Sequence, residues 1–197
     1  YSLSTAFDIT TAVYDNVSLY VGNQDSFPYG VTFNNDGTKM YIVGNTSNSV
    51  YQYSLSTAFD ITTAVYDNVS FSVVDQDTSP HAMVFNNDGT KMYVLGTASS
   101  SVHQYSLATA FNVATAVYDD VSLHVRAQDA NPHGLAFNND GTKMYVLGDA
   151  SDSVYRYSLL SEFDVATAVH DAVGFYVGDQ ESTPCGMTFN NDGTKMY

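Results

Sequence analysis

Four residues of types that bind metals or transfer protons stand at equal spacing, each directly after a proline. They are Tyr29, His81, His133 and Cys185, with neighbours 52 residues apart. Imidazole nitrogen and thiolate sulfur are ligands that zinc and copper prefer, and a neutral imidazole can accept a proton near neutral pH. We take His81, His133 and Cys185 as candidate zinc ligands. The alternative is that these side chains line a solvated channel without metal.

The segment before each of these prolines also repeats, with an amide followed by an acid. The pairs are Gln24 and Asp25, Gln76 and Asp77, Gln128 and Asp129, and Gln180 and Glu181. A ring of carboxylates could bind cations, basic peptides or sugar hydroxyls. Alternatively, these side chains satisfy backbone groups of a recurring connection. We predict that these pairs and the four residues after the prolines form one ligand-binding face.

A third repeated group is the turn at residues 34–37, Asn-Asn-Asp-Gly, with copies at 86–89, 138–141 and 190–193. Asn and Asp oxygens are calcium ligands, but the distal Glu of an EF-hand loop is missing. Asp-Gly between apolar runs is instead a strong hairpin signal. We favour a hairpin turn over a calcium loop. A lysine follows each turn (Lys39, Lys91, Lys143 and Lys195), and we expect it to neutralise a nearby carboxylate.

Charge and motif content exclude several classes of function. The chain has 21 acidic and 6 basic residues and a net charge of −15, which would repel both a phosphate backbone and an anionic membrane surface. Its single cysteine cannot form an internal disulfide. No G-x-S-x-G elbow or phosphate-binding glycine loop occurs. We therefore expect no nucleic-acid partner and no membrane partner.

The elements that must position these residues follow from a repeat of 52 residues. The string YSLSTAFDITTAVYDNVS at 1–18 recurs unchanged at 53–70 and returns with changes at 105–122 and 157–174. FNNDGTKMY stands at 33–41, 85–93, 137–145 and 189–197. No insertion interrupts this spacing, so each repeat is one structural unit.

One unit predicts four short strands, at 82–85, 91–95, 102–107 and 116–125, the last with alternating polar residues. Four strands in a repeat of this length are typical of a β-propeller blade. We predict an all-β propeller of 52-residue, four-stranded blades, with four blades' worth of strands in this chain. The predicted single array over 1–197 divides into a half blade 1–27, blades 28–79, 80–131 and 132–183, and a half blade 184–197.

A family resemblance supports this architecture. The string P-x-G-x-x-F-N-N-D-G-T-K-M-Y-V-x-G, followed by S-V-Y-Q-Y-S-L, resembles the propeller repeats of the YVTN and NHL type. It is most similar to tandem repeat propellers of uncharacterised secreted bacterial and phage-associated proteins. The resemblance implies a propeller, whereas such scaffolds serve adhesive, structural and enzymatic roles alike.

Near-identical repeats favour binding over catalysis, because catalysis needs different residues around one reacting centre. We predict a non-catalytic binding or scaffold module, not an enzyme, located outside the cell or on a cell or virion surface. No cofactor is expected beyond calcium or zinc at the sites above. Two alternatives remain open: a propeller-type hydrolase or lactonase with a channel metal held by His81, His133 and Asp77, and a multivalent glycan-binding lectin.

The expected partners are a glycan or protein ligand and the chain itself. The half blades 1–27 and 184–197 could complete each other within one chain or between two chains, which would remove exposed sheet edges. Two chains joined head to tail would form an eight-bladed ring.

Overall fold

The computed structural model describes all 197 residues, and its regular structure is almost entirely β-sheet. Three four-stranded antiparallel sheets follow one another along the chain. The first contains β3 (Pro28–Phe33), β4 (Lys39–Gly44), β5 (Ser49–Leu55) and β6 (Ala64–Ser72). The second contains β7 (Pro80–Phe85), β8 (Lys91–Gly96), β9 (Ser101–Leu107) and β10 (Ala116–His124). The third contains β11 (Pro132–Phe137), β12 (Lys143–Gly148), β13 (Ser153–Leu159) and β14 (Ala168–Tyr176).

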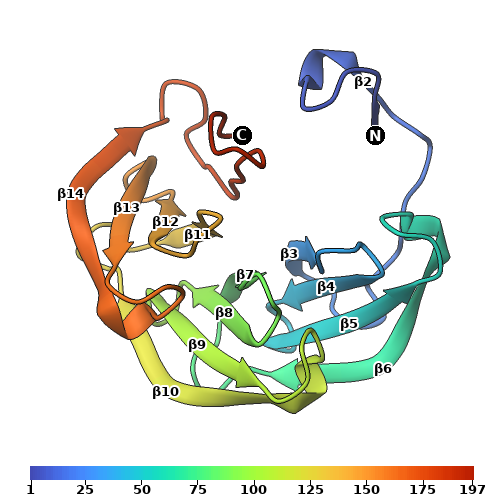
Figure 1. Cartoon of the computed structure of the whole chain (residues 1–197), viewed down its shortest axis with the longest axis horizontal. Helices are drawn as coiled ribbons and strands as arrows, with labels where there is room; N and C mark the ends of the chain where they lie inside the picture. Colours follow the sequence, from blue (N-terminus) through green and yellow to red (C-terminus); the bar gives the residue numbers. More distant parts are fainter.

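These sheets are the blades of a propeller and surround three sides of a central axis (Figure 1). Within each blade the strands run in sequence order from the inner strand (β3, β7 or β11) to the outer strand (β6, β10 or β14). The predicted all-β propeller with four-stranded blades is therefore confirmed. One short 3-10 turn per unit was not predicted: η1 (Ile9–Thr11), η2 (Ile61–Thr63), η3 (Val113–Thr115) and η4 (Val165–Thr167). No helix is long and apolar enough to span a membrane.

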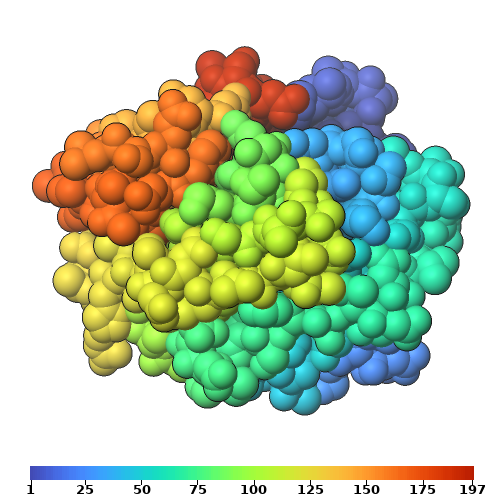
Figure 2. All heavy atoms as spheres, turned by 60° about the horizontal axis from the view of Figure 1, so that its bottom comes forward, coloured from blue at the N-terminus to red at the C-terminus, as the bar shows by residue number.

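The two ends of the chain form less sheet than we predicted. Residues 1–27 contain only the two-residue strands β1 (Ser2–Leu3) and β2 (Ala12–Val13), which pair with each other. Residues 184–197 contain a single bridge, between Phe189 and Met196. The part of the first segment around β1 and β2 and the C-terminal segment lie on the fourth side of the axis and touch there, as Figure 2 shows for the blue and red atoms. The Tyr197 hydroxyl donates to the Phe7 carbonyl at 2.7 Å.

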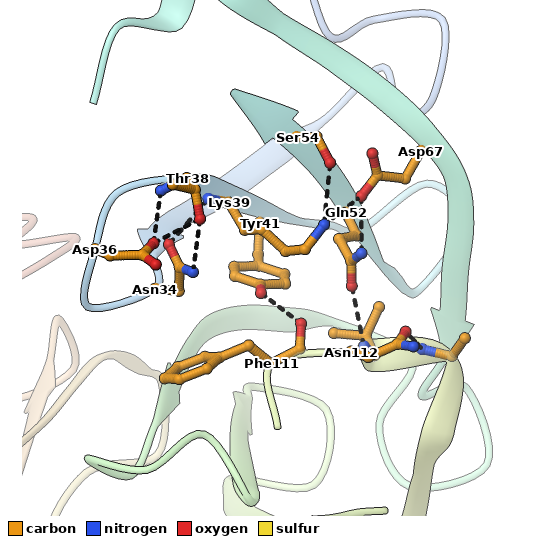
Figure 3. Close-up of polar contacts among 12 residues, drawn as sticks. Asn34, Asp36, Thr38, Lys39, Tyr41, Gln52, Ser54, Asp67, Phe111 and Asn112 are labelled. Atoms are coloured by element: carbon orange, nitrogen blue, oxygen red, sulfur yellow. Dashed lines mark hydrogen bonds and ion pairs between the residues drawn. The ribbon is translucent and has the colours of Figure 1, made fainter. Parts of the chain in front are cut away.

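Side chains of neighbouring blades interlock, so the core lies between blades. The Tyr41 hydroxyl donates to the Phe111 carbonyl at 2.6 Å (Figure 3). The Gln52 side chain accepts the Val113 backbone N–H at 3.1 Å. Two core clusters each join residues of two blades, one between the first and second blades and one between the second and third. Each blade is thus stabilised mainly by apolar burial against its neighbours.

The lysine after the turn of each of the three blades reaches a carboxylate on the outer strand, as predicted, whereas Lys195 forms no such ion pair. Lys39 Nζ lies 3.1 Å from Asp67 Oδ2, and the Lys91–Asp119 and Lys143–Asp171 pairs repeat this contact. Lys39 also donates to the Ser54 hydroxyl at 3.0 Å (Figure 3). The ion pair therefore ties the second strand of a blade to its third and fourth strands.

Candidate functional site

The largest cavity is the channel between the inner strands. It has a volume of about 510 Å³ and is lined by β3, β7, β11 and residues 185–191, together with Phe111 and Phe163. Tyr29, His81, His133 and Cys185 line it near the starts of these segments, and Asn35, Asn87, Asn139 and Asn191 line it beyond their ends. A concave site with a few polar groups over an apolar wall is the usual form of a small-molecule site.

Three of the four residues after the prolines lie together. The ring centroids of Tyr29 and His81 are 4.1 Å apart, and those of His81 and His133 are 4.4 Å apart. Close approach of the inner strands makes this contact possible. A Cβ atom at Gly30 would lie 2.9 Å from the His81 carbonyl oxygen, so a side chain there would push β3 away from β7. Small residues on these strands therefore bring the rings together.

The hydrogen bond of His81 determines which ring nitrogen is free. Its Nδ1 lies 2.9 Å from the Ser79 carbonyl oxygen, which can only accept, so Nδ1 carries the proton. In the neutral imidazole Nε2 therefore has the lone pair. Burial lowers the pKa of His81, since desolvation disfavours the charged ring, and the nearby His133 lowers it further. At neutral pH His81 is an uncharged base with a free Nε2.

His133 contacts an acid that His81 lacks. Its Nε2 lies 3.3 Å from Asp149 Oδ2, an ion-pair distance at an angle that does not make a hydrogen bond. The other oxygen of Asp149 accepts the Asn131 side-chain amide at 2.5 Å. His81 and His133 thus differ in environment although they hold the same position in their blades.

The opposite end of the channel is bordered by asparagines. Asn35 Nδ2 donates to the Asn87 carbonyl at 2.5 Å, and Asn87 donates to the Asn139 carbonyl at the same distance. Asn139 continues the series to the Asn191 carbonyl. No lysine or arginine is among the residues that line the cavity. The channel therefore offers uncharged hydrogen-bonding groups at both ends.

The candidate zinc ligands do not form a metal centre. His81 Nδ1 is bonded to a carbonyl group, and the exposed Cys185 donates its thiol to the Thr183 carbonyl at 3.2 Å. No three His, Cys, Asp or Glu side chains lie close enough to hold a metal ion together. The turn at residues 34–37 likewise uses its oxygens internally, since Asp36 accepts the Thr38 N–H and Asn34 accepts the Lys39 N–H, both at 2.9 Å. The residues present do not fit the zinc or calcium sites that we considered.

The acids of the repeated amide-acid pairs are not on a ligand-binding face, with one exception. Asp25, Asp77 and Asp129 are each 2% exposed. Asp77 accepts the backbone N–H groups of Ser79 at 2.7 Å and Ser99 at 2.9 Å, and the Ser99 hydroxyl at 2.5 Å. Their carboxylates are consumed by the backbone of two loops, so they cannot also bind a ligand. Asp77 also does not reach a channel metal. Only Glu181, in the last copy, is exposed.

The amides of three of these pairs bond to a tyrosine on the third strand of the following blade. Gln24, Gln76 and Gln128 accept the hydroxyls of Tyr53, Tyr105 and Tyr157 at 3.0, 3.3 and 3.1 Å. Gln180 is exposed. A variant in which Asp25, Asp77 and Asp129 are all changed would lose the hydrogen bonds that hold three loops. A loss of glycan binding by that variant would therefore not show that these acids bind the glycan. Of the residues that we predicted for the ligand-binding face, Tyr29, His81 and His133 at the channel mouth remain as the candidate site.

The buried Asp25 predicts a pH dependence of stability. Desolvation raises the pKa of Asp25, but hydrogen bonds from Ser47, Phe27 and Thr46 outweigh it and hold the pKa below its ordinary value of 3.8. A carboxyl group whose pKa is lower in the folded state stabilises the fold above its unfolded-state pKa, and that contribution is lost as the pH falls through the folded-state pKa. We expect the melting temperature to fall below about pH 4. Circular dichroism melts from pH 7 to pH 2 would measure this, and Asp25→Asn should make the fall shallower. An unchanged melting temperature at low pH would contradict the assignment.

No protein-family model and no curated protein matches the sequence, but solved structures do. A Bacteroides uniformis protein named "putative 6-phosphogluconolactonase" is 11% identical over 86% of this chain and 46% of its own, with a TM-score of 0.61. A Pseudomonas aeruginosa periplasmic gluconolactonase is 13% identical over the same shares, with a TM-score of 0.55. A Myceliophteria thermophila β-propeller domain is 7% identical over 81% of this chain and 46% of its own, with a TM-score of 0.51.

At these identities the likeness shows the propeller fold alone. The chain spans about half the length of the solved structures that it matches. Two of these structures carry lactonase names, and this contradicts our prediction that the chain is not an enzyme. The presence of this fold in proteins named as lactonases shows that a propeller scaffold does not exclude catalysis.

Proposed function

We propose that the channel is the active site of a propeller-type hydrolase that opens a small cyclic ester, such as the lactone of a sugar acid. One observation carries the proposal: His81 is a buried, neutral imidazole whose Nε2 is free and which lines the channel beside His133. The lactonase names of two proteins with this fold support the choice of reaction.

The reaction needs one base that returns its proton. His81 Nε2 takes a proton from a water molecule, and the resulting hydroxide attacks the ester carbonyl carbon. The tetrahedral intermediate collapses, the ring carbon–oxygen bond breaks, and protonated His81 gives its proton to the leaving alkoxide. Ser79 keeps Nδ1 protonated throughout, so the ring presents the correct nitrogen to water. Tyr29, at 4.1 Å from His81, covers one face of the ring.

The charge of the channel selects the substrate. Because no cationic side chain lines it and the chain carries −15, a phosphorylated lactone would enter without compensation. We therefore propose an uncharged lactone as the substrate. The location outside the cell or on a surface that we predicted remains part of this proposal.

His81→Gln should lower kcat/KM for an uncharged sugar lactone by about 100-fold, the lower range for loss of a general base. A pH-stat assay corrected for spontaneous hydrolysis would measure this, with His124→Gln on the outer strand β10 as the matched control. In the unaltered protein kcat/KM should fall with acid at a pH below about 6.5, the ordinary value for histidine, because the pKa of His81 is lowered. Equal rates for the unaltered protein and His81→Gln would contradict the proposal.

A further inference from the structure

The first blade exposes an apolar groove that the other two blades bury. The groove has a volume of about 370 Å³, and eight of its ten lining residues are hydrophobic, among them Leu19, Val21, Val31 and Phe33. Val31 is 60% exposed, whereas Met83 and Leu135, at the same position of the next two blades, are 3% and 4% exposed. The groove is therefore the surface on which, elsewhere in this molecule, the preceding blade packs.

The two existing interfaces show what the groove lacks. At each of them a tyrosine of the preceding blade packs on an inner-strand phenylalanine: Tyr41 on Phe85 and Tyr93 on Phe137, both at 4.7 Å. The same tyrosine donates its hydroxyl to a carbonyl in the connection between the third and fourth strands of the following blade. For Tyr41 this is the carbonyl of Phe111. In the groove the equivalent groups are the ring of Phe33 and the carbonyl of Phe59. The Phe59 residue is 57% exposed. The missing group is the tyrosine of a second strand.

The other end of the chain carries that tyrosine. Residues 184–197 align with 28–41, the first two strands of a blade, and place Tyr197 where Tyr41 stands. Residues 1–20 align with 53–72, which are the last three residues of the third strand and the whole fourth strand. In a complete blade Lys39 pairs with Ser54 and reaches Asp67, and the corresponding residues are Lys195, Ser2 and Asp15. The two end segments therefore match in register and in charge the beginning and the end of one blade, without a counterpart of residues 42–52.

The chain does not fill its own groove. Its residues 184–197 are held by the third blade, where Phe189 packs on Tyr145 at 4.7 Å. Tyr197 then reaches Phe7 rather than Phe59, so residues 1–20 stand as the next blade instead of completing this one. The chain also covers only 46% of a solved β-propeller domain.

We propose that two copies of this chain close one propeller ring, in which residues 184–197 of each copy complete a blade with residues 1–20 of the other. Tyr197 of the second copy fills the groove, packs on Phe33 and donates to the Phe59 carbonyl. The contact between Tyr197 and Phe7 opens in exchange. Two such interfaces related by a two-fold axis cover the exposed groove of both copies. The second copy also completes the wall of the channel, next to Tyr29. This proposal depends on the fold, and its tests do not depend on the proposed hydrolase activity.

Light scattering of the 197-residue chain should give about twice its 21.4 kDa. Val31→Glu places a charge in the groove at a position exposed within one copy, and it should reduce the mass to that of one chain. Val117→Glu, on the outer strand at 66% exposure, is the matched control and should leave the dimer intact. A single-chain mass for the unaltered protein over the accessible concentrations would overturn the proposal, and so would an open polymer that lengthens with concentration.

A disulfide trap distinguishes closure between copies from closure within one. Lys39 and Ser54 are directly opposed on neighbouring strands, so cysteines at Lys195 and Ser2 fall within disulfide distance only if these segments join as one blade. The variant carries Ser2→Cys and Lys195→Cys in a Cys185→Ser background. The expected product is a covalent dimer on a non-reducing gel. An oxidised product of single-chain mass would show closure within one chain and overturn the proposal, as would failure to oxidise.

Discussion

Replacing Asp77 by alanine is expected to lower the free energy of unfolding by about 3–5 kcal/mol, since each buried partner left without a hydrogen bond costs roughly 1–3 kcal/mol. The carboxylate is 2% exposed and accepts from the Ser79 N–H, the Ser99 N–H and the Ser99 hydroxyl. Alanine leaves all three part-buried donors without their acceptor. Urea unfolding followed by circular dichroism would measure the change.

Asp75 provides the matched control, because it stands two residues earlier in the same connection and is exposed. Asp75→Ala should change the free energy of unfolding by no more than about 0.5 kcal/mol. Asp77→Asn should fall between the two variants, since its amide oxygen can still accept from Ser79 while its nitrogen cannot accept from Ser99. Equal midpoints for Asp77→Ala and Asp75→Ala would mean that the carboxylate does not hold the loops together.

The strands were predictable because the residues that bound them recur in all four sequence repeats. The Asp-Gly of the repeated turn sets the hairpin between the first two strands, and Gly89 adopts the positive φ that this turn requires. Phe111 stands at a position that is phenylalanine in every repeat. It contacts Phe85 at a centroid distance of 5.3 Å and receives the Tyr41 hydroxyl. A contact that recurs in every repeat leaves a mark in the sequence.

The roles of the amide-acid pairs could not be predicted in the same way. A carboxylate at the tip of a loop that binds a ligand and a buried carboxylate that accepts hydrogen bonds from the loop backbone give the same repeated sequence. Asp77 is buried because Gly96 has no side chain: a Cβ there would lie 2.0 Å from the Asp77 carboxyl carbon. The register shift between Tyr118 and Val121 in the outer strand was not predicted either. The alternation of polar residues continues through the shift, so the sequence gives no sign of it.

Our exclusion of catalysis went wrong at the positions where the repeats differ. Four near-identical sequence repeats give the same side chain at most positions, but the residue after each proline is tyrosine, histidine, histidine and cysteine in turn. Packing then makes even the two histidines unequal, since His81 bonds to the Ser79 carbonyl and His133 faces Asp149. Repetition of the scaffold therefore does not prevent different residues from meeting at the axis, where a reacting centre needs them.

Gly89→Ala is expected to lower the free energy of unfolding by about 4 kcal/mol, the sum of roughly 1–2 kcal/mol for a left-handed alanine and about 1–3 kcal/mol for overpacking. Gly89 has a φ of +70°, and an added Cβ would lie 2.3 Å from the Phe111 ring. That ring cannot retreat freely. Its backbone N–H is bonded to the Gly89 carbonyl at 2.9 Å, and its carbonyl accepts from Tyr41 in the neighbouring blade.

Gly193 separates the two contributions, because it has the same turn and a φ of +69° but no atom within 4 Å of an added Cβ. Gly193→Ala should therefore cost only the backbone part, about 1 kcal/mol. The difference between the two variants in urea unfolding measures the contact between Phe111 and the turn. If both variants lost the same stability, the aromatic ring would play no part in fixing the turn, and the repeated glycine would be explained by its φ alone.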